Sequence, residues 1–254
     1  MIELRKWLGK SCGGFTLIEM AMVLIITGLL LGGAIKAIHG QTTKRRAEKS
    51  FDQLQEIREA ILGFAAINGR LPCPDTDFDG LENRAAGACV ANASGQFVGV
   101  VPWTTLGVNP VDSWSHLFSY QVTGLFADDV ALATTGTGTT TGEACPPAVP
   151  VACPAAASAS FSLKCQCEGD ITLQNAAGTT MVTAIPAVFL SHGPNGYGAY
   201  LPSGARMPTS GAHAAELENS DLTNGTYRLG GDDIVAWISP LVLKYRMVKA
   251  GRLP

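Results

Sequence analysis

The sequence predicts an α+β fold in which one long N-terminal helix packs on a mostly antiparallel β-sheet head. Three observations lead to this prediction. Residues 15–35 are almost wholly apolar, residues 36–69 continue with helical spacing, and short β-branched runs bounded by turn residues fill the chain from residue 70 onward. The chain has 254 residues, which is enough to bury a core in one or two domains.

Composition argues against two broad classes of protein. The chain has 29 Gly and 14 Pro, below the share that is typical of a disordered low-complexity chain. Its net charge is −3 and it has no dense block of lysine and arginine, so we expect no nucleic-acid partner.

The first predicted element is a membrane-spanning helix over residues 15–35. These residues carry a single charge, Glu19. At about 1.5 Å per residue, a helix of this length spans about 30 Å, the thickness of the hydrocarbon core of a bilayer. A cleaved secretory signal is the alternative, but its small residues follow the apolar run, whereas Gly13 and Gly14 precede it. We therefore expect a retained membrane span behind a basic leader, residues 1–14.

Residues 13–20, with the sequence GGFTLIEM, resemble the processing site of type IV prepilins and type II secretion pseudopilins. Those proteins have a basic leader that ends in Gly, followed by Phe and by Glu as the fifth mature residue. The resemblance implies that a prepilin peptidase cuts between Gly14 and Phe15 and methylates the new amine of Phe15. It also implies a type IV pilin-like fold, with a single inner-membrane span and a periplasmic head in a Gram-negative bacterium. The expected partners are other pilin or pseudopilin subunits and an inner-membrane assembly platform.

Glu19 needs a partner of opposite charge inside a membrane. An ionised carboxylate at the centre of a span costs about 2.5–3.5 kcal/mol on insertion scales. Cleavage would create a cationic amine on Phe15, and staggered subunits of a filament could bring this amine to the Glu19 of a neighbour. Glu19 is therefore the predicted residue for assembly and register. A carboxylate that merely reaches the membrane surface is the alternative.

The helix is predicted to continue through residues 36–69 as an amphipathic helix. The apolar residues Phe51, Leu54, Ile57, Ile61 and Phe64 recur at spacings of three and four, and charged residues fill the other face. Asn68-Gly69 predicts the C-terminal end.

Residues 70–254 are predicted to form the α+β head. The expected strands are Gln96–Val101, Leu117–Thr123, Ser160–Lys164, Ile171–Gln174, Met181–Leu190 and Asp233–Ser239, and a last helix follows Ser239-Pro240 to about Ala250. Residues 134–160 are rich in Thr, Gly, Pro and Ala, which predicts an exposed low-complexity loop.

Asp112-Ser113-Trp114, followed by Phe118 and Tyr120, resembles the Asp-Pro-Trp-Gly…Tyr loop of secretion pseudopilins. Here Ser113 and Ser115 replace the Pro and Gly of that loop.

Six cysteines remain if the leader, which contains Cys12, is removed. They are Cys73, Cys89, Cys145, Cys153, Cys165 and Cys167. An even number behind an export segment predicts disulfides in an oxidising compartment, with Cys73–Cys89 as a local pair and two bridges among the others. A zinc site is the alternative, but the paired CxxC spacing of a zinc ribbon is missing.

Asp75, Asp77, Asp79 and Gly80 follow the D-x-D-x-D-G form of a calcium loop. The twelfth position of an EF-hand requires Glu and here is Ala86, so a full EF-hand is excluded. A looser structural calcium site that includes Glu82 is one interpretation, and a solvated acidic turn is the other.

No enzyme is predicted. The chain lacks a G-x-S-x-G elbow, an HExxH helix and a phosphate loop, and His192 and Asp232-Asp233 suggest structural roles. The sequence therefore favours a minor pilin or pseudopilin of a type IV pilus or type II secretion filament. The alternative is a single-pass anchored periplasmic binding protein that never polymerises, for which Glu19 would be dispensable.

Overall fold

The computed structural model describes residues 14–127, 169–209 and 211–252, and within these it leaves out the side chains of residues 30–40 and of Leu125. The predicted leader up to residue 13, the strand Ser160–Lys164 and the loop 134–160 lie outside the described residues. Cys145, Cys153, Cys165 and Cys167 lie outside them as well.

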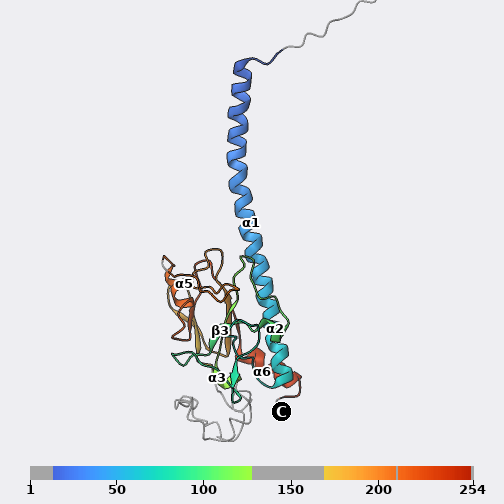
Figure 1. Ribbon diagram of the computed structural model, residues 1–254, viewed down its shortest axis with the longest axis vertical. Helices are drawn as coiled ribbons and strands as arrows, with labels where there is room; N and C mark the ends of the chain where they lie inside the picture. The colour runs from blue at the N-terminus through green and yellow to red at the C-terminus, as the bar shows by residue number, and fades with distance from the viewer. Residues whose placement is uncertain (1–13, 128–168, 210, 253–254) are drawn as a thin grey trace, which may run out of the picture. The chain divides into compact units, whose positions relative to one another are not determined.

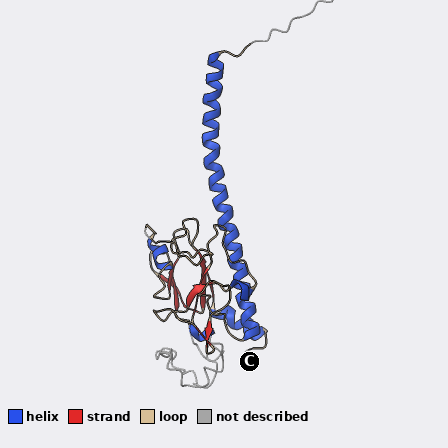
Figure 2. Cartoon of the chain, viewed as in Figure 1, coloured by secondary structure: helices blue, strands red, loops and turns tan. Residues whose placement is uncertain are grey.

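The described residues form mixed helix and antiparallel sheet (Figures 1 and 2). The helices are α1 (Leu17–Asn68), α2 (Trp103–Leu106), α3 (Gly124–Ala127), α5 (Ala214–Asn219) and α6 (Pro240–Lys249). The strands are β1 (Arg84–Ala85), β2 (Ala88–Cys89), β3 (Val98–Val100), β4 (Ser119–Val122), β5 (Ile171–Gln174), β6 (Thr180–Ile185), β7 (Ala187–Ser191), β8 (Thr226–Arg228) and β9 (Ile234–Ile238). The chain divides into two compact units within α1, one ending at Arg45 and the other beginning at Arg46.

α1 ends where the sequence predicts, because Gly69 adopts a left-handed backbone conformation with φ 77°. The amide of Gly69 donates to the carbonyl of Ala65 at 2.8 Å, and the side chain of Asn68 donates to the carbonyl of Phe64 at 3.0 Å. The bond from Gly69 satisfies a carbonyl that the last helical turn leaves open, and the bond from Asn68 adds a side-chain contact at the same end.

The central sheet has the strand order β3-β4-β7-β9, with all neighbours antiparallel. The second sheet has the order β6-β5-β8, in which β5 and β8 run parallel, and β1 pairs with β2. β7 is buried along its whole length, and its side chains alternate between two apolar clusters. Phe189 joins the cluster with α1 and α6, whereas Val188 and Leu190 join the cluster with the second sheet. The unit from residue 46 onward therefore has three layers, which are the helices α1 and α6, the central sheet and the second sheet.

The helical face that packs on the central sheet differs from the predicted one. Leu54, Ile57 and Ile61 are buried as predicted, but Phe51 is 50% exposed. Phe64 lies at the edge of the core, where the guanidinium of Arg70 stands 5.1 Å from its ring centre. Leu62 and Ala65 occupy the core instead, because a stripe that follows a helix of 3.6 residues per turn drifts along its surface.

The predicted strand Met181–Leu190 is wrong in one respect. The structure divides this run at Pro186, which has no amide hydrogen to donate, so that β6 lies in the second sheet and β7 in the central one. The run thus forms a corner between two layers.

The turn before β4 contains Ser115 in a left-handed conformation, with φ 69°. Asp112 organises this turn, because its Oδ1 accepts hydrogen bonds from the amides of Trp114, at 2.8 Å, and His116, at 2.9 Å. Ser115 is the residue that stands where the pseudopilin loop has Gly, a residue that adopts this conformation without steric cost.

Replacing Ser115 by Gly is therefore expected to stabilise the chain. A side chain in the left-handed region costs about 1–2 kcal/mol, and the greater freedom of Gly in the unfolded chain offsets part of the gain. We expect a net gain of about 0.5–1 kcal/mol, measured by thermal or denaturant unfolding of the full chain in detergent. Ser113→Gly is the control, and it should destabilise the chain, since φ of Ser113 is not positive. Equal destabilisation by both variants would contradict this account.

Candidate functional site

The start of α1 is closed by a reciprocal pair of hydrogen bonds between Thr16 and Glu19. The amide of Glu19 donates to Oγ1 of Thr16 at 3.3 Å, and the carboxylate of Glu19 accepts from the amide of Thr16 at 2.9 Å. The Thr16 hydroxyl also donates to the same carboxylate at 2.9 Å. This arrangement is a capping box, which satisfies amides that have no partner within the helix. The T-x-x-E spacing of Thr16 and Glu19 is the sequence signature of a capping box, and it indicates this second role of Glu19.

The predicted cleavage bond lies just outside the helix. Gly14 and Phe15 precede the first helical residue, Leu17, and Phe15 is 79% exposed. A Cβ added to Gly14 would meet no atom within 4 Å, and Gly14 is not among the residues with positive φ. Neither packing nor backbone conformation within the chain therefore requires Gly at this position. A role for Gly14 would therefore lie in letting another molecule approach the backbone closely.

The first part of α1 is apolar on all sides. Large apolar side chains from Leu17 to Leu29 are exposed to between 48% and 93%. The one hydroxyl in this stretch, on Thr27, donates to the carbonyls of Val23 and Leu24 within the helix, at 2.8 and 3.1 Å. A helix that is apolar all round is stable only when other apolar groups cover it.

A search over the described residues finds no helix with a long enough apolar stretch to cross a membrane. The predicted span 15–35 extends into residues 30–40, whose side chains are not described.

Comparison with known protein families matches residues 9–35 to the prokaryotic N-terminal methylation motif. This chain carries the type IV prepilin signature. No curated protein and no solved structure matches the chain. The match supports a type IV pilin- or pseudopilin-like protein, from a class that is structural rather than catalytic. The motif implies processing by a prepilin peptidase and assembly with other pilins in general.

The head contains a disulfide between Cys73 and Cys89, the local pair that the sequence favoured, with a Cα–Cα distance of 5.2 Å. The bridge fixes the hairpin β1–β2 to the segment that follows α1. The same segment is held by Tyr120, whose buried hydroxyl donates to the carbonyl of Pro72 at 3.0 Å.

The acidic loop brings together three of its four predicted metal ligands. Asp75, Asp77 and Asp79 each offer a carboxylate oxygen within 4.8 Å of the other two. Asp75 is buried and already accepts backbone amides, from Phe78 and Gly80 at 2.7 Å and from Asp77 at 3.1 Å. Burial raises the pKa of Asp75, although these hydrogen bonds act against the rise. Asp75 thus organises the turn by itself.

The fourth predicted ligand, Glu82, is engaged elsewhere. Both of its oxygens accept from the guanidinium of Arg70, at 2.6 and 2.7 Å, and one also accepts from the amide of Cys73 at 3.0 Å. Burial by itself would raise the pKa of Glu82, but the hydrogen bonds from Arg70 and from the Cys73 amide, together with the charges of Arg70 and Arg84, outweigh burial and hold this pKa below its usual value. The bidentate pair ties the acidic loop to the end of α1.

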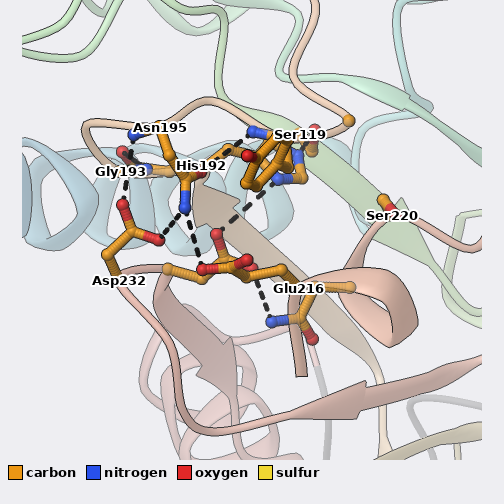
Figure 3. Close-up of polar contacts among 12 residues, drawn as sticks. Ser119, His192, Gly193, Asn195, Glu216, Ser220 and Asp232 are labelled. Carbon is orange, nitrogen blue, oxygen red and sulfur yellow. Dashed lines mark hydrogen bonds and ion pairs between the residues drawn. The ribbon is translucent and has the colours of Figure 1, made fainter. Parts of the chain in front are cut away.

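A buried polar cluster lies between the sheets and α5 (Figure 3). Oγ of Ser119 lies 2.9 Å from Nε2 of His192, and Nδ1 of His192 lies 3.9 Å from Oδ1 of Asp233. Ser119 comes from β4, His192 follows β7 and Asp233 precedes β9, so three adjacent strands supply these residues. The three side chains are of the types found in a Ser-His-Asp hydrolytic triad, but the 3.9 Å between His192 and Asp233 is longer than the hydrogen bond that a triad needs.

The burial of this trio is unfavourable for hydrolysis. His192 is 1% exposed and Ser119 is 6% exposed, so no substrate carbonyl can approach the hydroxyl without displacing the core. Burial also lowers the pKa of His192 to about 3, far below the range near neutrality that a general base needs. The geometry therefore supports the structural role that the sequence suggested for His192.

Asp232 and Glu216 form a pair of acidic residues at the edge of this cluster. The side-chain amide of Asn195 donates to both carboxylates, at 2.6 Å to Asp232 and 2.9 Å to Glu216. A hydrogen bond from Asp232 lowers the pKa of Glu216 to about 2, whereas burial and this same bond raise the pKa of Asp232 to about 6. The pair therefore holds one proton on Asp232 in mildly acidic solution. Glu216 in turn caps α5, since its carboxylate accepts from the amide of His213 at 2.6 Å.

Asp233 should make the stability of the head depend on pH. Burial raises its pKa from 3.8 to about 7, so the folded chain holds this proton more tightly than the unfolded chain does. The resulting stabilisation is complete below pH 4 and is lost as the pH rises to 7. Asp233→Asn cannot ionise, so its stability relative to wild type should increase between pH 4 and pH 8, by a few kcal/mol at most at about 1.4 kcal/mol per pKa unit.

Thermal unfolding of both proteins across this pH range checks the prediction. Asp52→Asn makes the same substitution at an exposed carboxylate of α1 and serves as the matched control, against which the pH dependence of Asp233→Asn is compared. A constant difference for Asp233→Asn would show that Asp233 does not titrate in this range.

Proposed function

We propose that this chain is a minor pilin or pseudopilin, a structural subunit of a type IV pilus or a type II secretion filament. In this proposal the leader 1–14 is removed, Phe15 is N-methylated, and residues 15–35 hold the subunit in the inner membrane before assembly. Residues 36–69 continue the helix into a periplasmic head formed by residues 70–254, which has a type IV pilin-like fold. The partners are the prepilin peptidase, other pilin or pseudopilin subunits and the inner-membrane assembly platform.

The observation that carries the proposal is the start of α1, where an all-round apolar helix holds one carboxylate in its first turn. The apolar surface needs cover from lipid or from other helices, and Glu19 needs a cation when that cover is in place. Cleavage after Gly14 would supply such a cation on Phe15. Anchored monomers need the apolar surface and can use Glu19 as a helix cap, but they have no use for its charge.

Intact mass of the protein from host membranes, with and without the prepilin peptidase, tests processing. We expect loss of residues 1–14 and gain of one methyl group, both dependent on the peptidase. Gly14→Val should block the cut because its branched side chain hinders the peptidase, while the open space around Gly14 leaves the fold unchanged. Assembly is scored by recovery of the subunit in sheared filaments. An uncleaved wild-type chain would favour the anchored periplasmic binding protein.

Two variants separate the charge of Glu19 from its capping role. Glu19→Gln retains the capping box, because Gln also caps from this position, whereas Glu19→Ala loses both the cap and the charge. If the charge pairs with the Phe15 amine of a neighbour, both variants are processed but absent from filaments. Normal assembly of Glu19→Gln would show that only the cap matters.

We also propose a structural calcium ion at Asp75, Asp77 and Asp79, whose carboxylate oxygens are donors that calcium prefers. Calcium should raise the unfolding temperature of the chain. The size of this shift should increase with the logarithm of the calcium concentration above the dissociation constant. The double variant Asp77→Asn, Asp79→Asn should abolish this response, because it leaves one carboxylate, that of Asp75, whose two oxygens already accept backbone amides. A wild-type melting curve that calcium does not move would remove the calcium site from the proposal.

A further inference from the structure

The C-terminal helix α6 is apolar on two faces, and the head covers only one of them. Leu243 and Met247 are buried in the core against α1. Leu241, Tyr245 and Val248 are exposed to 78%, 65% and 40%. Their spacing of four and three places these three residues on one side of the helix, and we call them the α6 stripe.

Basic residues surround the α6 stripe. From residue 234 to the end, the sequence has no acidic residue and four basic ones, Lys244, Arg246, Lys249 and Arg252. Arg246 pairs with Glu59 at 2.7 Å, and Arg252 donates to the carbonyl of Ala66 at 2.9 Å, so these two hold α6 to α1. Lys249 is exposed directly beside Val248. A partner of this face therefore needs an apolar centre and negative charge.

The chain carries such a surface at α5. Residues 214–233 contain five acidic residues and one basic residue, Arg228. The carboxylates of Glu216 and Asp233 are buried, whereas Glu218 and Asp221 are partly exposed. Leu217 stands 48% exposed among them. The side-chain amide of Asn224 lies within 3.4 Å of Glu218 and 2.8 Å of Asp221, so these two carboxylates lie close together. Glu218 also lies 3.7 Å from the guanidinium of Arg228. We call Leu217, Glu218 and Asp221 the acidic edge.

We propose that the α6 stripe of one subunit docks on the acidic edge of a second copy of this chain. Each surface has an apolar centre and a charged border, and the two borders have opposite sign. Figure 1 shows α5 and α6 on opposite sides of the sheets, so one molecule cannot join its own two surfaces. A contact between two different faces repeats from copy to copy and yields an open assembly instead of a closed dimer. The inference rests on the proposed filament function, for which it names a contact between heads.

The small size of the two surfaces also fits this setting. A stripe of three side chains gives a weak contact between free heads. Helices already packed in a filament would hold neighbouring heads at high effective concentration, where a weak contact suffices to fix their register. An anionic membrane would also attract a basic apolar helix, but it would leave the acidic edge without a role.

Site-specific photo-cross-linking tests the proposal. Tyr245 is replaced by benzoylphenylalanine in the full chain, in membranes and filaments of the producing host, and the linked peptides are identified by mass spectrometry. We expect links to residues 214–233 of a second copy. The same photoreactive residue at Met181, which is 56% exposed on β6, is the matched control and should give no such link.

Charge reversal provides a second measurement on the same sample. Lys249→Glu should lower the yield of the link about fivefold, and adding Asp221→Lys in the partner copy should restore it, which loss of folding could not do. Links to lipid, links to a different protein, or no link in correctly processed subunits would overturn the docking proposal and leave the filament function standing. Links between unprocessed chains would support the docking and count against the filament function.

Discussion

The apolar surface of α1 from Leu17 to Leu29 is the constraint on which the N-terminal unit depends. Its large apolar side chains are exposed to between 48% and 93%, and a helix of this kind is stable only in contact with lipid or with other apolar groups. The polar groups of this stretch are held within the helix, as an apolar environment requires. The Thr27 hydroxyl is satisfied within the helix, and Glu19 is held by Thr16 at the first turn, where the carboxylate also interacts favourably with the helix dipole.

The architecture of the head depends in a similar way on β7. Because this strand is buried on both faces, its neighbours β4 and β9 must also present side chains to two different layers. On β4, Tyr120 faces α1, while Ser119 and Gln121 face the second sheet. On that inner face the side-chain oxygen of Gln121 accepts from the hydroxyl of Tyr227 at 2.6 Å, whereas Nδ1 of His192 and Oδ1 of Asp233 are buried without a hydrogen-bond partner among the described residues. The cluster around His192 is thus a result of strand alternation across three layers.

The sequence was sufficient to predict the parts of the fold that follow from local chemistry. The end of α1 at Asn68, the position of β5 and the start of α6 at Pro240 depend on capping, β-branched runs and proline, which act over a few residues. The division at Pro186 and the exposure of Phe51 depend on which layer each segment meets, which local patterns do not contain. The same holds for the site. The signature at Gly14, Phe15 and Glu19 is local, whereas the contact of Glu82 with Arg70 and the approach of Ser119, His192 and Asp233 are tertiary.

The hydrogen bonds between Arg252 and the end of α1 have a mechanical consequence. In the proposed filament, force would reach the head through α1. Arg252 attaches the end of the chain to carbonyls at the end of α1, and Arg246 pairs with Glu59 two turns earlier. The load would therefore pass into the central sheet and α6 together, so that several contacts would have to break at the same time before the head could detach.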